Sequence, residues 1–89
     1  MKEELKKNVS MITLLRDYGH FIGEYKKTFH CPFHNDSNPS AVIYNNKEGD
    51  YFMCFGCSIQ GDIFTIVGIL ENTKDFKRQL AIINEKYGR

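Results

Sequence analysis

Two short pairs of metal-ligating residues constrain this chain more than any other feature of its sequence. The first pair lies in the sequence CPFH at residues 31–34 and the second in CFGC at residues 54–57, with nineteen residues between them. Each pair brings two ligands together across a tight turn, and two such pairs complete the tetrahedral nitrogen and sulfur shell of a structural Zn²⁺. We therefore predict one zinc site, formed by Cys31, His34, Cys54 and Cys57.

Four protein ligands leave no coordination position for an activated water molecule, so we expect this zinc to be structural. His30 should face away from Cys31 and not be a ligand. An iron–sulfur cluster or a thioredoxin-like redox pair is an alternative, although the first usually takes a fourth thiolate and the second leaves His34 without a role. The sequence has no glycine-rich phosphate loop, no carboxylate cluster for Mg²⁺ and no recognisable nucleophile–base pair. We predict that the chain is not an enzyme by itself.

At 89 residues, of which 42% are hydrophobic, the chain is long enough for a single domain over residues 1–89 but buries little surface. Structural Zn²⁺ contributes about 10–16 kcal/mol in zinc-finger peptides, compared with a net folding free energy of about 5–15 kcal/mol. We therefore expect the metal-free chain to be largely disordered through its middle.

Three cysteines cannot all pair in disulfides, and the lysine-rich start leads into no apolar run of the signal-peptide type. Charged residues also interrupt the apolar stretches, so that none reaches the roughly 18 residues that suggest a membrane span. These features predict a reducing, cytoplasmic setting and no membrane partner. The formal net charge of +1 falls to zero once Zn²⁺ is added and three thiol protons are removed, so charge alone does not indicate nucleic acid.

The apolar residues between Lys2 and Phe21 recur at the spacing of an amphipathic helix. We expect one helix or two short ones, with Ser10 capping a second helix over residues 11–18 and Gly19 ending it. Residues 21–30 are rich in aromatic and β-branched types, which predicts a strand before the first ligand pair.

Residues 40–44 and 51–54 predict a β-hairpin that carries Cys54 back towards Cys31, and Gly56 is expected to take a positive φ in the second turn. After the hairpin, Gly61 and Asp62 mark the start of a buried helix. A last helix is expected from about Thr73 to Gly88. Its inward side chains should be Phe76, Leu80, Ile83 and Tyr87, and Lys74, Lys77, Arg78 and Lys86 should point mostly outward.

Together these motifs resemble one known family. The chain looks like the CHC2-type zinc-binding domain of bacterial and phage DNA primases. Four runs carry the resemblance: Cys-Pro-Phe-His-Asn-Asp at 31–36, Pro-Ser at 39–40, Cys-Phe-Gly-Cys at 54–57 and Gly-Asp at 61–62. The resemblance spans about residues 8–87. It implies an α+β zinc ribbon, in which a small antiparallel sheet carries the metal between N- and C-terminal helices.

In that family the domain engages single-stranded template DNA and helps a separate polymerase domain to choose where a primer starts. The resemblance therefore implies a DNA-binding accessory module of replication that acts in trans with a primase, polymerase or helicase. Two features depart from the family. Asp-Ser-Asn at residues 36–38 replaces a segment that usually holds a basic residue, and the chain ends at Arg89 without a polymerase part. The Met1 start and the capped last helix lead us to expect a stand-alone protein.

Aromatic and basic residues alternate in parts of the chain, as base stacking and phosphate contact require. The alternative is a protein-interaction module whose exposed aromatic side chains dock onto a replication protein without direct DNA binding. In a third interpretation every aromatic side chain belongs to the core. The candidate nucleic-acid contacts are Tyr25, Lys26, Lys27, Phe29, Tyr44, Lys47, Tyr51, Phe55, Lys77 and Arg78.

Overall fold

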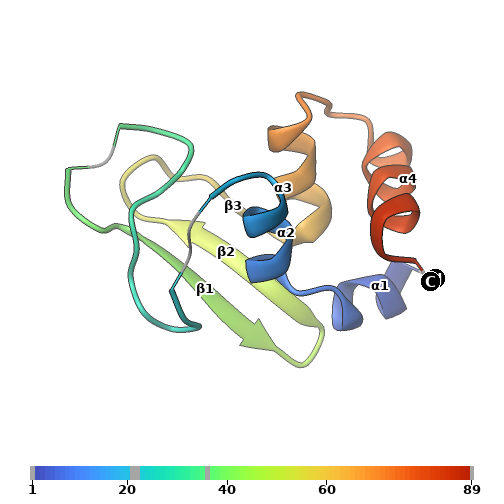
Figure 1. Ribbon diagram of the computed structural model, residues 1–89, viewed down its shortest axis with the longest axis horizontal. Helices are drawn as coiled ribbons and strands as arrows, with labels where there is room; N and C mark the ends of the chain where they lie inside the picture. The colour runs from blue at the N-terminus through green and yellow to red at the C-terminus, as the bar shows by residue number, and fades with distance from the viewer. Residues whose placement is uncertain (1, 21–22, 36, 89) are drawn as a thin grey trace.

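The computed structural model describes residues 2–20, 23–35 and 37–88. Figure 1 shows α1 and α4 at one end of the molecule and the loops that hold the two ligand pairs at the other. Within the described ranges, no helix has both the length and the apolar character needed to cross a membrane. In chain order the elements are α1 (Lys2–Asn8), α2 (Met11–Asp17), β1 (Ala41–Asn46), β2 (Gly49–Cys54), β3 (Gln60–Gly61), α3 (Ile63–Leu70) and α4 (Phe76–Tyr87).

The three strands form one antiparallel sheet in the order β1, β2, β3. The predicted hairpin is confirmed, but its strands extend further towards the turn than expected. The last residue pair of the β1–β2 ladder before the turn is Asn46 with Gly49. Gly61 and Asp62 precede the buried helix as expected, because α3 begins at Ile63 with Asp62 as its N-cap. Gly61 also belongs to β3, a short strand that was not predicted, and pairs there with Phe52 of β2.

The two faces of the hairpin differ in what covers them. Ala41, Ile43 and Phe52 alternate onto the inner face, where each is fully buried together with side chains of α2 and α3. On the outer face Tyr44 and Tyr51 lie directly opposite each other in the strand register. This small sheet, with helices before and after it in the chain, is the expected α+β architecture.

Capping side chains determine where the helices begin and end. Ser10 Oγ accepts a hydrogen bond from the Thr13 N–H at 3.2 Å, which starts α2 as a helix separate from α1. After α2 the Gly19 N–H bonds to the Arg16 carbonyl, with a φ of 88° at Gly19, as in a Schellman motif. Asp62 Oδ1 accepts two N–H bonds from the first turn of α3 at 3.0 Å. All three predicted boundaries are confirmed.

The last helix begins later than predicted. Thr73 Oγ1 accepts a bond from the Asp75 N–H, and Asp75 Oδ1 in turn accepts one from the Lys77 N–H. Residues 73–75 therefore form the cap, and α4 begins at Phe76. The prediction that Phe76 faces inward is wrong, because Phe76 is 44% exposed, although its ring packs edge-on against Phe64.

The strand predicted within residues 21–30 is a single bridge in the described part of that segment, residues 23–30. Phe29 and Ala41 exchange backbone hydrogen bonds of 2.9 and 3.1 Å. Before that bridge Lys26 has a φ of 66°, which interrupts the extended chain. Phe21 and Ile22, also part of the predicted strand, lie outside the described residues.

Asp50 is a charged side chain that the fold buries, with only 5% of it exposed. Its carboxylate accepts hydrogen bonds from the Met11 N–H at 2.9 Å, the Tyr25 hydroxyl at 2.7 Å and the Asn45 side-chain amide at 2.7 Å. A buried carboxylate is tolerated where such donors replace lost water. Asp50 therefore joins the start of α2, the loop over residues 23–28 and the hairpin.

Gly49 should not tolerate a side chain, because α1 passes directly against it. Its φ is 126°, and a Cβ built there would lie 2.3 Å from the Lys6 carbonyl oxygen. We expect Gly49→Ala to lower the free energy of unfolding of the zinc-loaded protein by at least about 2 kcal/mol, measured by chemical denaturation. Gly23→Ala is the matched control, since a Cβ there would meet nothing within 4 Å. Equal losses in both variants would contradict this packing.

Candidate metal centre

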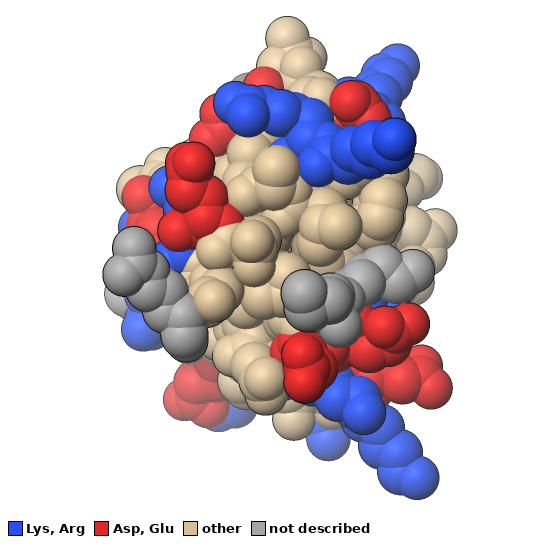
Figure 2. Space-filling model, turned by 90° about the vertical axis from the view of Figure 1, so that its right-hand side faces the viewer, with Lys and Arg blue, Asp and Glu red and all other residues tan. Residues whose placement is uncertain are grey.

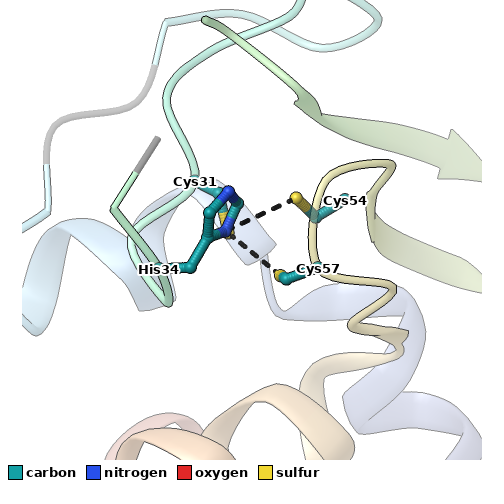
Figure 3. A group of neighbouring side chains, drawn as sticks. All are labelled: Cys31, His34, Cys54 and Cys57. Atoms are coloured by element: carbon teal, nitrogen blue, oxygen red, sulfur yellow. Dashed lines mark hydrogen bonds between the residues drawn. The ribbon is translucent and has the colours of Figure 1, made fainter. Parts of the chain in front are cut away.

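The two ligand pairs meet at one site. Cys31, His34, Cys54 and Cys57 each place one ligand atom within 4.8 Å of the other three, and Figure 3 shows the four side chains facing one another. Cys31 Sγ is 3.8 Å from Cys57 Sγ, and Cys54 Sγ is 3.9 Å from His34 Nδ1. Two thiolates bound to one tetrahedral zinc at about 2.3 Å are roughly 3.8 Å apart. The spacing and the donor set therefore fit a single zinc ion, as predicted.

The first pair is attached to the core through aromatic rings. The Phe33 N–H donates to Cys31 Sγ at 3.4 Å, and the Phe33 ring packs edge-on against Phe52 with centroids 5.4 Å apart. Phe29, just before the pair, packs against the same ring at 6.0 Å. Because Phe52 is fully buried, these contacts fix the turn at residues 31–34, which is neither a helix nor a strand.

The second pair follows directly from β2. Cys54 ends the strand, and its Sγ accepts a bond from the Gly56 N–H at 3.3 Å and lies 3.4 Å from Ser40 Oγ. The turn closes through a 3.0 Å bond from the Ser58 N–H to the Cys54 carbonyl. The positive φ that we expected at Gly56 falls on Ser58 instead, with a value of 65°.

Gly56 provides room for the other pair. A Cβ at this position would lie 2.9 Å from Ser40 Oγ and 3.0 Å from Nε2 of His34. The imidazole therefore rests against the Gly56 backbone while its Nδ1 faces the thiol of Cys54. Glycine is required here because the two turns approach closely, and not for its conformational freedom.

The surroundings of the cysteines affect their pKa values in opposite directions. Burial acts to raise the pKa of Cys54, but bonds from the Ser40 hydroxyl and from the Cys57 and Gly56 N–H groups outweigh it and bring the pKa to about 7. Burial raises the pKa of Cys31 to about 12. Zinc binds the thiolate form and displaces the proton, so Cys54 offers a ligand at neutral pH more readily than Cys31.

The candidate aromatic contacts divide between surface and core. Phe55 is 67% exposed, and Tyr44, on the outer face of the sheet, is 36% exposed. Tyr51 is half-buried, and its hydroxyl bonds to Gln60 Oε1 at 2.8 Å. Phe29 is a core residue with 9% of its surface exposed, so its ring is out of reach of a nucleic-acid base.

The candidate basic contacts are all exposed but do not form one surface. Lys26 and Lys27 lie in the loop beside β1, where the Lys26 N–H bonds to a β1 carbonyl, and Lys47 lies in the hairpin turn. Lys77 and Arg78 belong to α4, at the end of the molecule away from the ligand pairs (Figure 1). The structure thus brings the first three lysines to the hairpin and leaves the α4 residues apart.

A groove between α1 and α4 was not predicted. It has a volume of about 590 Å³, and its apolar lining comes from Leu5, Leu80, Ala81 and Tyr87. Figure 2 views the molecule from this end, with uncharged side chains in the middle of the face and basic side chains gathered along its upper edge.

Sequence reasoning missed Asp50, which lies between the two strands predicted at residues 40–44 and 51–54. Its signal was the alternation of Asp50, Phe52 and Cys54, which places all three on one face of a strand. The contact between Ser40 and the Cys54 thiol was also missed, because it joins the residue before β1 to the end of β2.

Comparison with known proteins gives matches along the chain. The model of the CHC2 zinc finger family matches residues 1–89. The DNA primase of Aquifex aeolicus is 29% identical over 89 residues, which cover 98% of this chain and 17% of that primase. The DNA primase of Deinococcus radiodurans is 38% identical over 65 residues, 65% of this chain and 11% of that protein. The Gene 58 protein of Mycobacterium phage D29 is 40% identical over 37 residues, 42% of this chain and 27% of that protein. The chain therefore spans less than a third of each relative.

Ser40 should strengthen metal binding through its contact with the Cys54 thiolate. We expect Ser40→Ala to weaken zinc affinity by about tenfold, the usual effect of removing a hydrogen-bond partner of a metal ligand. Competition against a colorimetric chelator measures the change. Ser37→Ala, at an exposed position in the same loop, is the control and should leave the affinity unchanged. Equal affinities for the wild type and Ser40→Ala would contradict this role.

Proposed function

Because the chain belongs to the CHC2 zinc-finger family, we propose that it is a zinc-dependent accessory module of DNA replication that binds single-stranded DNA. A role in replication and priming follows from the relatives, which are DNA primases. Direct binding of single-stranded DNA is a more specific proposal than a role in replication. The surface of the hairpin supports it.

The outer face of β1 and β2 is the observation that carries the proposal. Tyr44 and Tyr51 lie directly opposite each other on this face, and Phe55, in the turn that follows β2, is 67% exposed. Every base has a π-face, so exposed rings bind single strands with little sequence preference, at about 1–3 kcal/mol for each stacked base. In this proposal Lys26 and Lys27, which lie in the loop beside β1, meet the phosphates.

The proposed role is accessory and not catalytic. Four protein ligands would fill the coordination shell of the zinc, so the metal would organise the fold without activating a water molecule. The catalytic step of priming would then come from a primase, polymerase or helicase complex with which the module acts in trans. A cytoplasmic, reducing compartment would keep its cysteines available to the metal.

A second function, docking onto a replication protein without direct DNA binding, is favoured by the groove between α1 and α4. Its apolar lining with charged residues at the border suits the apolar stripe of a partner helix. The groove lies on helices away from the ligand pairs, so a partner seated there would leave the outer face of the hairpin open (Figure 1).

Truncation of the exposed rings should weaken DNA binding. We expect Tyr44→Ala and Phe55→Ala each to reduce the affinity of the zinc-loaded protein for a labelled single-stranded oligonucleotide by about fivefold or more at low salt, measured by fluorescence anisotropy. The control is Ile69→Ala on α3, which should leave the affinity unchanged. Ile69 is 40% exposed, close to the 36% of Tyr44. The logarithm of the affinity should also fall linearly with the logarithm of the salt concentration. No binding by the zinc-loaded wild type, alone or with a primase, would refute the proposal.

Variants on the two surfaces discriminate between the two functions. Ala81 is exposed in the groove, and Ala81→Arg should obstruct a docked helix while leaving DNA binding unchanged. Lys26→Glu combined with Lys27→Glu should abolish DNA binding and leave docking intact. Co-precipitation with a replication primase, alongside the anisotropy assay, measures both. If Ala81→Arg weakens co-precipitation with the primase and the double lysine variant leaves DNA binding unchanged, the docking function is favoured over the DNA-binding function.

A further inference from the structure

The turn at residues 25–27 holds a lysine in a backbone conformation that lysine rarely adopts. Lys26 has a φ of 66°, in the left-handed region where residues other than Gly, Asn and Asp are strained. Its N–H bond to the Ile43 carbonyl, at 2.8 Å, holds the turn at the outer edge of β1 beside Tyr44. Lys27 follows and lies 3.5 Å from Glu24 in a pair whose side chains are 72% and 70% exposed, so water screens that pair strongly.

The side chain of Tyr25 fixes the same turn from inside the molecule. Its hydroxyl donates to Asp50 Oδ2 at 2.7 Å and lies 3.2 Å from Ser10 Oγ. Asp50 is 5% exposed, and the same carboxylate oxygen accepts the Met11 N–H at 2.9 Å. The carboxylate is therefore held independently of the turn. Burial raises the pKa of Tyr25, so its hydroxyl keeps its proton and donates at neutral pH.

Two features distinguish this turn from an ordinary surface turn. A backbone bond at Lys26 and a partly buried side-chain bond at Tyr25 fix the turn. Its strained position also carries a positively charged side chain, where Asn would be less strained. Strained backbone persists where the surrounding structure determines it, and such positions gather at binding sites. The backbone conformation of the turn therefore gives no reason for a positive charge at this position.

We infer that Asp50 and Tyr25 are positioning residues, which hold the Lys26–Lys27 turn as a preformed site for two phosphates of a single DNA strand. The inference rests on the proposed DNA-binding function. A turn that is ordered before binding loses less conformational freedom when the strand arrives. Two lysines that each neutralise one phosphate of a single strand contribute about −1.4 to the slope of log affinity against log salt.

The test is Tyr25→Phe, which keeps the ring and removes the hydroxyl. In the zinc-loaded protein we expect the affinity for single-stranded oligothymidylate to fall about threefold to tenfold, the effect of one lost hydrogen bond. Hydrogen exchange at the Lys26 amide should also become faster. The matched control is Tyr18→Phe, which removes a hydroxyl bond to Glu71, away from the hairpin and from the groove, and should leave the affinity unchanged.

A second background separates positioning from general stability. In a protein that carries Lys26→Asn and Lys27→Gln, the turn keeps a residue suited to the left-handed region but has no charge to position. There Tyr25→Phe should cause no further loss of affinity. An equal loss in both backgrounds, or no loss in the wild-type background, would overturn the inference.

Failure of the proposed function gives a different result, because the wild-type protein itself would then not bind oligothymidylate at any salt concentration. Hydrogen exchange needs no DNA. Unchanged exchange at the Lys26 amide in Tyr25→Phe would overturn the positioning role of Tyr25 whether or not the protein binds a single strand.

Discussion

The contact between the two ligand pairs supports the whole end of the molecule that carries the hairpin loops. Pairing of β1 with β2 returns Cys54 towards Cys31, and the shared metal then joins a strand end to a turn with no sheet hydrogen bonds of its own. The aromatic contact of Phe33 with Phe52 contributes on the order of 1 kcal/mol, whereas structural zinc contributes about 10–16 kcal/mol. We therefore expect bound zinc to contribute more to the order of the first turn than the aromatic contact does.

β2 connects this metal end to the rest of the fold. Its inner face presents a buried carboxylate at Asp50, a buried ring at Phe52 and a thiol at Cys54, at alternate positions along six residues. Each meets a different part of the chain: the start of α2, the rings before and within the first pair, and the metal ligands. One short strand thus aligns a polar, an apolar and a metal-binding contact, which explains why a chain of this length holds a defined shape.

Local spacing predicted the features that depend on neighbouring residues. The caps at Ser10 and Asp62, the hairpin and the four-ligand group follow from short patterns, and the structure contains them. Features that depend on distant contacts were not predictable in this way. The room at Gly56 is needed because an imidazole from the other pair rests on it, and Asp50 is buried because Met11 and a tyrosine reach it across the fold.

The bridge between the loop at residues 26–29 and β1 has a consequence for how this sheet meets other molecules. Backbone bonds from Lys26 and Phe29 already occupy the outer edge of β1 between Ala41 and Ile43, and α1 packs against Gly49 at the start of β2. An extended peptide or a second copy of the chain therefore finds little free backbone there for strand addition, which is the usual route to edge-to-edge aggregation. Along this covered part of the β1 edge, recognition would therefore occur through side chains and not through strand addition.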